Sequence, residues 1–204
     1  MKKMKFTLIA AMLLMVTLAS AQVSLGIKGG VNMSNFYGDE LNDNNLKIGF
    51  NAGLSADFDF SPNSAIQTGL FFTAKGAKYG SASAEFTVNP MYLQLPLHYA
   101  YKIDVTPGTR VVLHAGPYAA YGVAGKMKLK GSAGGISGET DGTNVFGDNK
   151  LLKPFDAGLG LGVGAEFGQI SLDLGWDMGL VNISNTSNGD IKNQNAYLSV
   201  GYKF

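Results

Sequence analysis

The sequence predicts an all-β protein, an eight-stranded antiparallel up-and-down transmembrane β-barrel. Apolar and polar residues alternate in eight segments after residue 21, and a period of two indicates β-strands. Most of these segments have ten residues or more. A tilted strand needs about 9–11 residues to cross a membrane, whereas ordinary strands have about 5–6. Short and long connections also alternate along the chain, which is typical of outer-membrane barrels with short periplasmic turns and longer extracellular loops.

The first 21 residues predict a cleaved secretory signal peptide. Lys2, Lys3 and Lys5 precede an apolar run over residues 6–19, and Ala19-Ser20-Ala21 has the small-residue pattern of a cleavage site. The run is shorter than the roughly 20 residues of a membrane-spanning helix, and an uncleaved N-terminal anchor is the alternative. We therefore expect residues 1–21 to be removed and residues 22–204 to form one outer-membrane barrel domain.

Composition excludes several classes of protein. The chain has no Cys, which excludes disulfides, thiolate catalysis and Cys-bound zinc. Cleavage after residue 21 would remove three lysines and change the formal charge from +1 to −2, which gives no electrostatic reason to expect nucleic-acid binding. All 28 glycines follow residue 21. This glycine content disfavours helices, whereas strands tolerate it where backbones curve or approach closely.

The first four segments each carry one mostly apolar face. Odd positions are apolar in residues 23–33, and even positions are apolar in residues 48–60. The third segment, residues 65–79, follows the same pattern except that Phe71 interrupts its polar face. In residues 91–102, "MYLQLPLHYAYK", the odd positions are apolar or aromatic. Each of these segments is therefore expected to form a strand with one side facing lipid.

The last four segments repeat this pattern, and one of them is rich in glycine. They cover residues 110–125, 155–167, 170–180 and 195–204. In residues 155–167, "FDAGLGLGVGAEF", glycines alternate with apolar side chains. The strict spacing by two predicts a strand with a small inner face, not the strand–turn–helix of a nucleotide-binding glycine loop.

The connections predict how the strands are joined. Short turns, "SPNS", "DVTPGT" and "GQ", follow the second, fourth and sixth strands, whereas longer polar loops follow the others. The longest polar loop is expected over residues 125–153. An even number of strands places both termini on the periplasmic side. Because lipid offers no partners for backbone groups, the last strand should pair with the first.

The polar faces of the strands predict a network of charged side chains inside the barrel. An eight-stranded barrel is just wide enough for side chains to fill, and buried charges must be paired. The expected lumen residues are Lys28, Asp57, Asp59, Lys75, His98, Lys102, Arg110, His114, Asp156, Glu166, Asp173, Asp177 and Lys203.

Aromatic residues on the apolar faces gather at the short-turn ends of the strands. This position predicts a periplasmic aromatic girdle at the membrane interface. The terminal aromatic residue, preceded by alternating apolar residues, is also similar to the signal that the bacterial barrel-assembly machinery reads. The expected girdle and assembly-signal residues are Phe58, Phe60, Tyr99, Tyr101, Phe167, Tyr202 and Phe204.

Four motifs resemble a known family. "YLQLPLHYAYK", "AGPYAAY", "FDAGLGLGVGAEF" and "GLVNIS" occur in the order and spacing seen in the PorT-type, or porin-like, outer-membrane β-barrel family of Bacteroidota. Here Gln94 replaces the usual acidic residue, and His98 stands where an apolar residue is common. The resemblance covers nearly all of residues 22–204 and implies an outer-membrane barrel. It does not specify one function, since only some members are implicated in protein secretion and gliding.

Two histidines are the candidates for catalysis. If the "DVTPGT" turn centres near Thr106, His98 lies directly opposite His114, and Lys102 lies opposite Arg110. A His pair can act as a base or a metal site, and the alternative is a pair of hydrogen-bonded interior residues. We favour the interior pair, and no serine nucleophile is evident near either His on the same face. We therefore expect no catalytic, metal or cofactor site.

Three function classes remain open. A structural or surface-interaction barrel is favoured, because eight strands leave little lumen and loops vary freely on such scaffolds. The alternatives are a narrow porin-like channel for small solutes and a lipid-modifying enzyme. The expected partners are outer-membrane lipid, the barrel-assembly machinery during insertion, and an extracellular ligand or protein at the outer loops. We expect no nucleic-acid partner, and a monomer in the outer membrane of a Gram-negative bacterium.

Overall fold

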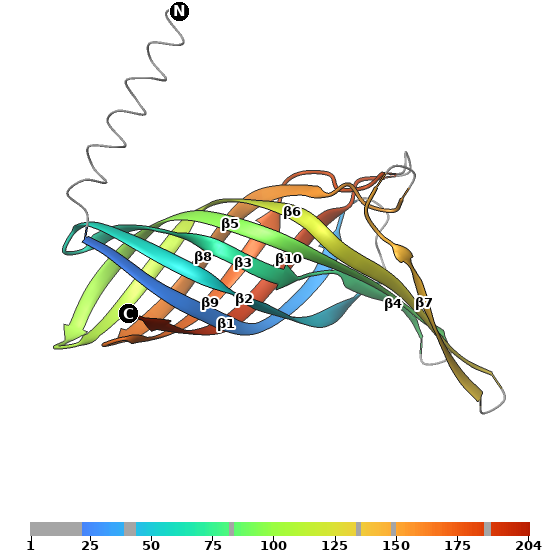
Figure 1. Cartoon of the computed structure of the whole chain (residues 1–204), viewed down its shortest axis with the longest axis horizontal. Coiled ribbons are helices and arrows are strands. Elements are labelled where there is room, and N and C mark those ends of the chain that lie inside the picture. The colour runs from blue at the N-terminus through green and yellow to red at the C-terminus, as the bar shows by residue number, and fades with distance from the viewer. Residues whose placement is uncertain (1–21, 39–43, 82–83, 134–135, 148–149, 186–188) are drawn as a thin grey trace, which may run out of the picture.

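A computed structural model describes residues 22–38, 44–81, 84–133, 136–147, 150–185 and 189–204, which form an antiparallel β-barrel (Figure 1). The predicted signal peptide, residues 1–21, lies outside the described residues. Within these ranges, no helix is long and apolar enough to cross a membrane. The strands are β1 (Gln22–Tyr37), β2 (Asn44–Ser61), β3 (Ser64–Ala74), β4 (Ala77–Ser81), β5 (Ala84–Thr106), β6 (Thr109–Ala133), β7 (Ile136–Asn144), β8 (Phe155–Phe167), β9 (Ile170–Gly179) and β10 (Lys192–Lys203).

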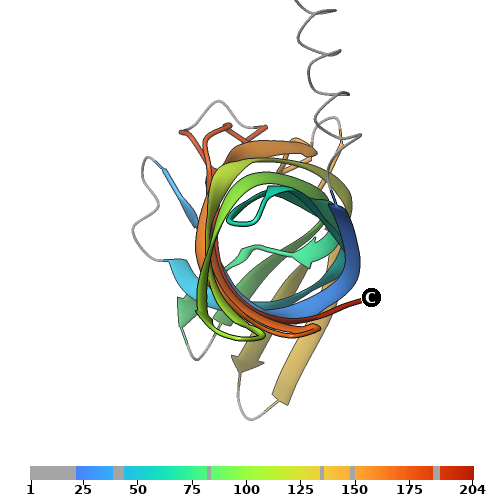
Figure 2. The ribbon, with the colours of Figure 1, turned by 90° about the vertical axis from the view of Figure 1, so that its left-hand side faces the viewer.

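Eight of these strands close into a ring, as the sequence predicts. Each pairs with its neighbours in the order β1–β2–β3–β5–β6–β8–β9–β10, and β10 returns to β1. The closing pair extends from Gly26, opposite Lys203, to Tyr37, opposite Lys192. Figure 2 shows this ring from its short-turn end. Closure leaves no unpaired strand edge in the wall of the ring, which is the requirement for a sheet surrounded by lipid.

The three short turns are confirmed and lie at one end of the ring. They connect β2 to β3, β5 to β6 and β8 to β9, at residues 62–63, 107–108 and 168–169. The chain terminus at Phe204 lies at the same end (Figure 1), where its backbone N–H donates to Leu25 O at 2.9 Å. The longer connections are therefore at the opposite end.

The third predicted strand, residues 65–79, is not continuous. It divides into β3 and β4 at Lys75 and Gly76. Gly76 has φ +129°, and a Cβ there would lie 2.0 Å from Val88 O, so glycine is needed where the chain bends close to β5. A strictly alternating sequence does not reveal this bend, because the residues on either side keep their strand pattern.

The fourth and fifth strands are longer than predicted, and part of the expected 125–153 loop is strand. β5 begins at Ala84, before the predicted start at residue 91, and β6 continues to Ala133. β7 then pairs back on β6 with Ile136 opposite Ala133. Together β4, β7 and the neighbouring ends of β5 and β6 form a sheet beyond the ring, here named the extension (Figure 1). The polar composition of this segment hid strands that pair in water and need no apolar face.

The two faces of the wall differ as predicted. Outward side chains such as Leu161 and Leu174 are each 55% exposed, whereas the inward Asp156 and Lys75 are fully buried. Such an arrangement is the reverse of a water-soluble barrel, since large apolar side chains cover the outside. The ring therefore presents an apolar surface to its surroundings and a polar interior that must satisfy its own charges.

Candidate functional site

The lumen is filled by three layers of polar side chains and, at the long-loop end, by an apolar cluster. The first layer, here the short-turn layer, contains Asp57, Asp59, Lys102, Glu166 and Lys203. Lys203 Nζ lies 2.6 Å from both Asp57 Oδ2 and Glu166 Oε1. Lys102 Nζ lies 2.6 Å from Asp59 Oδ1 and 3.7 Å from Asp57 Oδ2. Two lysines thus bridge three carboxylates across the lumen near its mouth.

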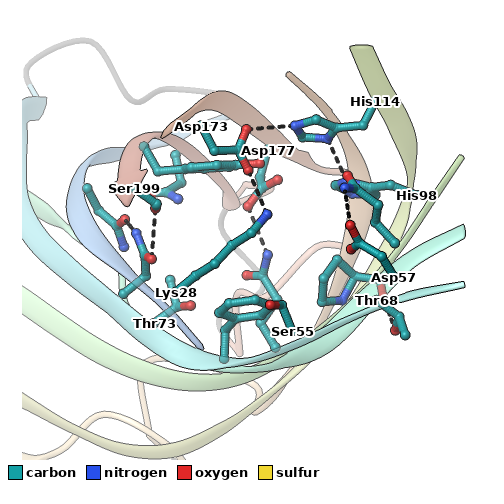
Figure 3. A pocket seen from close by; sticks show the side chains of 18 residues that line it. Lys28, Ser55, Asp57, Thr68, Thr73, His98, His114, Asp173, Asp177 and Ser199 are labelled. Carbon is teal, nitrogen blue, oxygen red and sulfur yellow. Dashed lines mark hydrogen bonds and ion pairs between the residues drawn. The ribbon is translucent and has the colours of Figure 1, made fainter. Parts of the chain in front are cut away.

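The second layer, here the histidine layer, contains Lys28, His98, His114 and Asp173 (Figure 3). The two imidazole rings stack at 5.1 Å between centroids, and their Nδ1 atoms lie 3.0 Å apart. His114 Nε2 lies 2.8 Å from Asp173 Oδ1, and Lys28 Nζ lies 3.2 Å from Asp173 Oδ2. The layer is therefore a continuous chain of hydrogen bonds from His98 to Lys28.

Glycines of β8 make room for the histidine pair. A Cβ at Gly160 would lie 2.8 Å from His98 Nε2, and a Cβ at Gly162 would lie 2.5 Å from His114 Nε2. Neither imidazole could keep its position against an alanine at these sites. The small inner face predicted for residues 155–167 is therefore the surface on which the two rings rest.

A cavity of about 70 Å³ adjoins the histidine layer. Polar side chains from seven of the eight ring strands line it, and β8 contributes none. Asp177 lies on this cavity, is 2% exposed and accepts a hydrogen bond from Gln94 Nε2 at 2.9 Å. The lumen thus retains a small polar space beside the histidine layer.

The third layer, here the tyrosine layer, surrounds a fully buried ion pair. Lys75 Nζ lies 3.1 Å from Asp156 Oδ2, and both side chains are 0% exposed. The ammonium group also lies 4.4 Å from the ring centroid of Tyr118 and 5.4 Å from that of Tyr92. Asn193 Nδ2 donates to Asp156 Oδ2 at 2.9 Å. A charge removed from water is stabilised here by an opposite charge, an amide and two aromatic faces.

An apolar cluster, here named the plug, closes the long-loop end of the lumen. Its loop residues Val145, Phe146, Leu152 and Ile183 are 9% exposed or less and pack with Tyr92 and other buried residues of the ring. The rings of Phe146 and Tyr92 meet edge to face at 5.4 Å. Leu152 N donates to Val145 O at 2.9 Å, so backbone hydrogen bonds hold the loop segments over the opening.

Most of the predicted lumen residues lie together inside the ring. Eleven of them are joined by ion pairs or hydrogen bonds in the three layers, and Asp177 lies on the cavity. The eleven are Lys28, Asp57, Asp59, Lys75, His98, Lys102, His114, Asp156, Glu166, Asp173 and Lys203.

The prediction for Arg110 is wrong, and so is the predicted register of β5 and β6. Arg110 Nε lies 2.8 Å from Asp104 Oδ1, with the two side chains 42% and 60% exposed. Lys102 is opposite Val112 and not Arg110, and His114 is opposite Ala100. The hairpin turns later than Thr106, at residues 107–108, which moves the pairing by two residues and leaves Arg110 at the mouth.

Several lumen residues were not predicted from the sequence. Tyr92 and Tyr118 occupy inward positions of their strands and are buried. The alternation of the sequence assigns them to the lumen, but only charged residues and histidines were included in the predicted network. The plug residues include two short apolar pairs within a polar loop, Val145-Phe146 and Leu151-Leu152. Such short apolar pairs in a long loop are therefore a sequence signal of this closure.

The predicted girdle residues lie at the short-turn end and face outward. Phe60 and Tyr99 are each 49% exposed, and their ring centroids are 6.2 Å apart. Tyr202 and Phe204 are 45% and 71% exposed, with ring centroids 6.0 Å apart. The remaining members at this end are Phe58, Tyr101 and Phe167.

Comparisons with known proteins place this geometry in context. Residues 18–185 match the model of the family described as the outer membrane protein beta-barrel domain. The search of curated proteins finds no match. Among solved structures, the chain is similar to neisserial surface protein A (14% identity, TM-score 0.47, covering 90% of this chain and 99% of that one). It is also similar to Ail of Yersinia pestis (17%, 0.45, 90% and 99%) and to a major outer membrane protein of Thermus thermophilus (14%, 0.47, 90% and 100%).

Proposed function

Because the chain belongs to the outer membrane protein β-barrel domain family, we propose that it is a structural or surface-interaction barrel whose outer loops contact a molecule outside the cell. It is a small outer-membrane β-barrel domain. The observation that carries the proposal is the closed lumen, in which three paired layers lie below an apolar plug. A barrel filled in this way offers its loops and extension, rather than its interior, to other molecules.

Planar-bilayer conductance tests the closed lumen against the channel alternative. The purified barrel is expected to give no single-channel conductance above background, because the layers and the plug fill the cross-section. A reproducible conductance from the wild-type protein would favour a narrow porin-like channel for small solutes instead. A pull-down from intact outer membranes with the full barrel, compared with a variant that lacks the extension, tests whether this surface captures a partner.

The short turns and both termini are proposed to lie in the periplasm of a Gram-negative cell. Support comes from the common end shared by the turns and Phe204, from the aromatic residues there, and from residues 1–21 as a cleaved signal peptide. Since the chain has no Cys, single substitutions report topology cleanly. A membrane-impermeant maleimide should label Lys128→Cys in intact cells and should label Gln169→Cys, in the short turn between β8 and β9, only after lysis. The reverse pattern would overturn the orientation.

The finer assignment is to the PorT-type group of Bacteroidota. Four motifs in order support it, including "YLQLPLHYAYK" on β5 and "FDAGLGLGVGAEF" on β8. The assignment carries no secretion role, since family members differ in function. If deletion of the gene abolishes protein secretion, that role would be added. Normal secretion in the deletion strain would leave the surface-interaction proposal as it stands.

Assembly is proposed to depend on the final strand. Tyr202 and Phe204 alternate with inward residues and would be read by the barrel-assembly machinery, while lipid surrounds a monomeric ring. Deletion of Phe204 is expected to lower the amount of heat-modifiable, folded barrel in outer membranes. A normal amount of folded protein would contradict this role, and the conservative Phe204→Tyr variant should assemble normally.

The chain is proposed not to act as an enzyme. His98 and His114 are used in the stacked pair, and His114 bonds to Asp173 inside the wall. An unchanged lipid profile in cells that carry His98→Ala would agree with this proposal. A changed profile at equal amounts of folded barrel would support the lipid-modifying alternative.

A further inference from the structure

The charges of the three layers and the cavity do not balance when both histidines are neutral. Four lysines there face six carboxylates, and a fifth buried lysine, Lys47 on β2, lies outside these layers. The lysines are Lys28, Lys75, Lys102 and Lys203, and the carboxylates are Asp57, Asp59, Asp156, Glu166, Asp173 and Asp177. Asp59 and Glu166 lie near the mouth, where water reaches them. The uncompensated negative charge that lies farthest from water must therefore belong to one of the other four acids.

Asp177 is the one of these acids without an ion pair in the part of the chain that the structure describes. It is 2% exposed, and among the ion pairs of the described residues none includes it, whereas Lys28 is paired with Asp173 and Lys75 with Asp156. Its contacts are amides: Gln94 Nε2 at 2.9 Å and Asn195, which lies directly opposite it on β10. Neutral donors alone do not neutralise a carboxylate held in a low-dielectric interior.

Three further residues that line the same cavity each have a buried atom without a partner among the described residues. Gln94 Oε1, His98 Nε2 and Asn195 Oδ1 are without a hydrogen bond, and all three residues line the cavity together with Asp177. Figure 3 labels His98 and Asp177 on this cavity. Their side chains belong to residues that are 7%, 5% and 2% exposed. The two amide oxygens can only accept. A carboxylate and two free acceptors on one cavity call for a ligand that donates hydrogen bonds or carries positive charge, and a cation would also supply the charge that Asp177 lacks.

The positions of these atoms are fixed by the wall. A Cβ at Gly160 would lie 2.7 Å from Asp177 Oδ1 and 2.8 Å from His98 Nε2, so both atoms lie over the same glycine. Asp177 and Asn195 are held in one cross-strand pair. The acceptors are therefore grouped by the β-sheet register and do not depend on a mobile loop.

We propose that this cavity binds a monovalent alkali cation, with Asp177 supplying the charge and Gln94 Oε1 and Asn195 Oδ1 supplying oxygen ligands. Hard cations take carboxylate and amide oxygens as ligands, and one unpaired carboxylate matches a single positive charge. No group of three or more His, Asp or Glu side chains suited to a metal occurs in the part of the chain that the structure describes, which argues against a transition metal. A volume of about 70 Å³ admits an ion with accompanying water.

The cation site goes beyond the proposed surface function and is independent of it. The plug covers the long-loop end, so the ion would enter from the short-turn end, past the lysines of the short-turn layer. A bound cation would stabilise the folded barrel by mass action, because the unfolded chain lacks the site. Failure of the surface-interaction proposal in a pull-down leaves this prediction unaffected.

Thermal unfolding of the purified full-length barrel tests the site. Midpoints are compared in chloride salts of Na⁺, K⁺ and N-methylglucamine at equal ionic strength, with a millimolar CaCl₂ arm. The wild type should gain a saturable rise in midpoint with Na⁺ or K⁺ over N-methylglucamine. Asp177→Asn should lose this difference, whereas Asp104→Asn, which removes an exposed carboxylate at the mouth, should keep it.

Three outcomes would overturn the proposal. Equal midpoints in all salts would mean that no alkali cation binds in the cavity. A salt difference that survives in Asp177→Asn would place the cation elsewhere, and a larger rise with Ca²⁺ would contradict a monovalent site. If Asp177→Asn does not fold, wild-type crystals in RbCl decide, since an anomalous peak beside Asp177 is expected and its absence refutes the site.

Discussion

The two ends of the lumen are closed by different interactions. At the short-turn end, Lys102 and Lys203 bridge three carboxylates, and one of these, Asp59, has a side chain that is 24% exposed. At the long-loop end, a single fully buried pair, Lys75 and Asp156, lies under an apolar plug. Charges near water are partly solvated and screened, whereas the buried pair depends wholly on its protein partners. The same residue types should therefore differ in energetic importance between the two ends.

The largest effect is expected for Lys75→Met. This substitution leaves Asp156 buried without its cation, and removal of one partner of a buried pair typically costs about 3–5 kcal/mol. The free energy of unfolding should fall by that amount in urea titrations that follow the heat-modifiable folded fraction. The double variant Lys75→Met/Asp156→Leu should recover much of the loss. A single variant as stable as the wild type would show that the burial of Asp156 does not depend on Lys75.

The plug should contribute a similar but smaller amount. Phe146→Ala removes an aromatic ring that packs on Tyr92 and on the bare backbone of Gly122. Such truncations cost about 3–5 kcal/mol, and we expect the lower limit because Phe146 is 9% exposed at the end of the lumen. Leu129→Ala, which is 55% exposed on the extension, is the matched control and should change stability little.

Conductance separates the plug from the layers below it. Because the polar layers still fill the lumen, Phe146→Ala should remain at background conductance despite its lower stability. A variant that conducts freely would mean that the plug alone closes the barrel, and the contrast between the two ends would then concern permeability as well as stability.

At the short-turn end, Lys203→Met is expected to cost less than Lys75→Met. It removes charged hydrogen bonds to Asp57 and Glu166, each 2.6 Å long, which are worth about 1.5–3 kcal/mol as a class. Asp57 keeps Lys102 at 3.7 Å. The loss should shrink at high salt, because the side chains of Lys203 and Glu166 are 14% and 11% exposed and are partly screened near the mouth, whereas the loss in Lys75→Met should not. Equal salt dependence of the two variants would remove the distinction between the ends.

The sequence predicts the wall of the barrel better than its interior contacts. Period two assigns each side chain to a face, because the inward and outward environments differ so strongly. The β5–β6 register was wrong by two residues, which preserves every face. His98 and His114 thus still point inward and contact each other. Lys102, which was expected opposite Arg110, instead forms an ion pair with Asp59. Faces tolerate a slip of two, but individual contacts do not.

The plug and the extension could not be predicted for a different reason. Contacts with strands distant in the sequence bury Val145, Phe146 and Leu152. Such contacts leave no periodic pattern in the local sequence. The extension has strands in a polar segment, where pairing with β6 rather than an apolar face determines the structure. Only the three-dimensional path of the loops shows which apolar residues return to the lumen.

The smallest effect is expected for Arg110→Ala, at the outer limit of the short-turn end. Its ion pair with Asp104 is 2.8 Å long, but the side chains are 42% and 60% exposed, and exposed pairs contribute about 0.2–1 kcal/mol. A double-mutant cycle with Asp104→Ala isolates that coupling in urea titrations. A coupling energy above about 2 kcal/mol would mean that solvent does not weaken ion pairs at this mouth. Lys203→Met and Lys75→Met would then be expected to destabilise the barrel equally. A small coupling places Arg110, Lys203 and Lys75 in one series, in which the energetic importance of a cation rises with its distance from water.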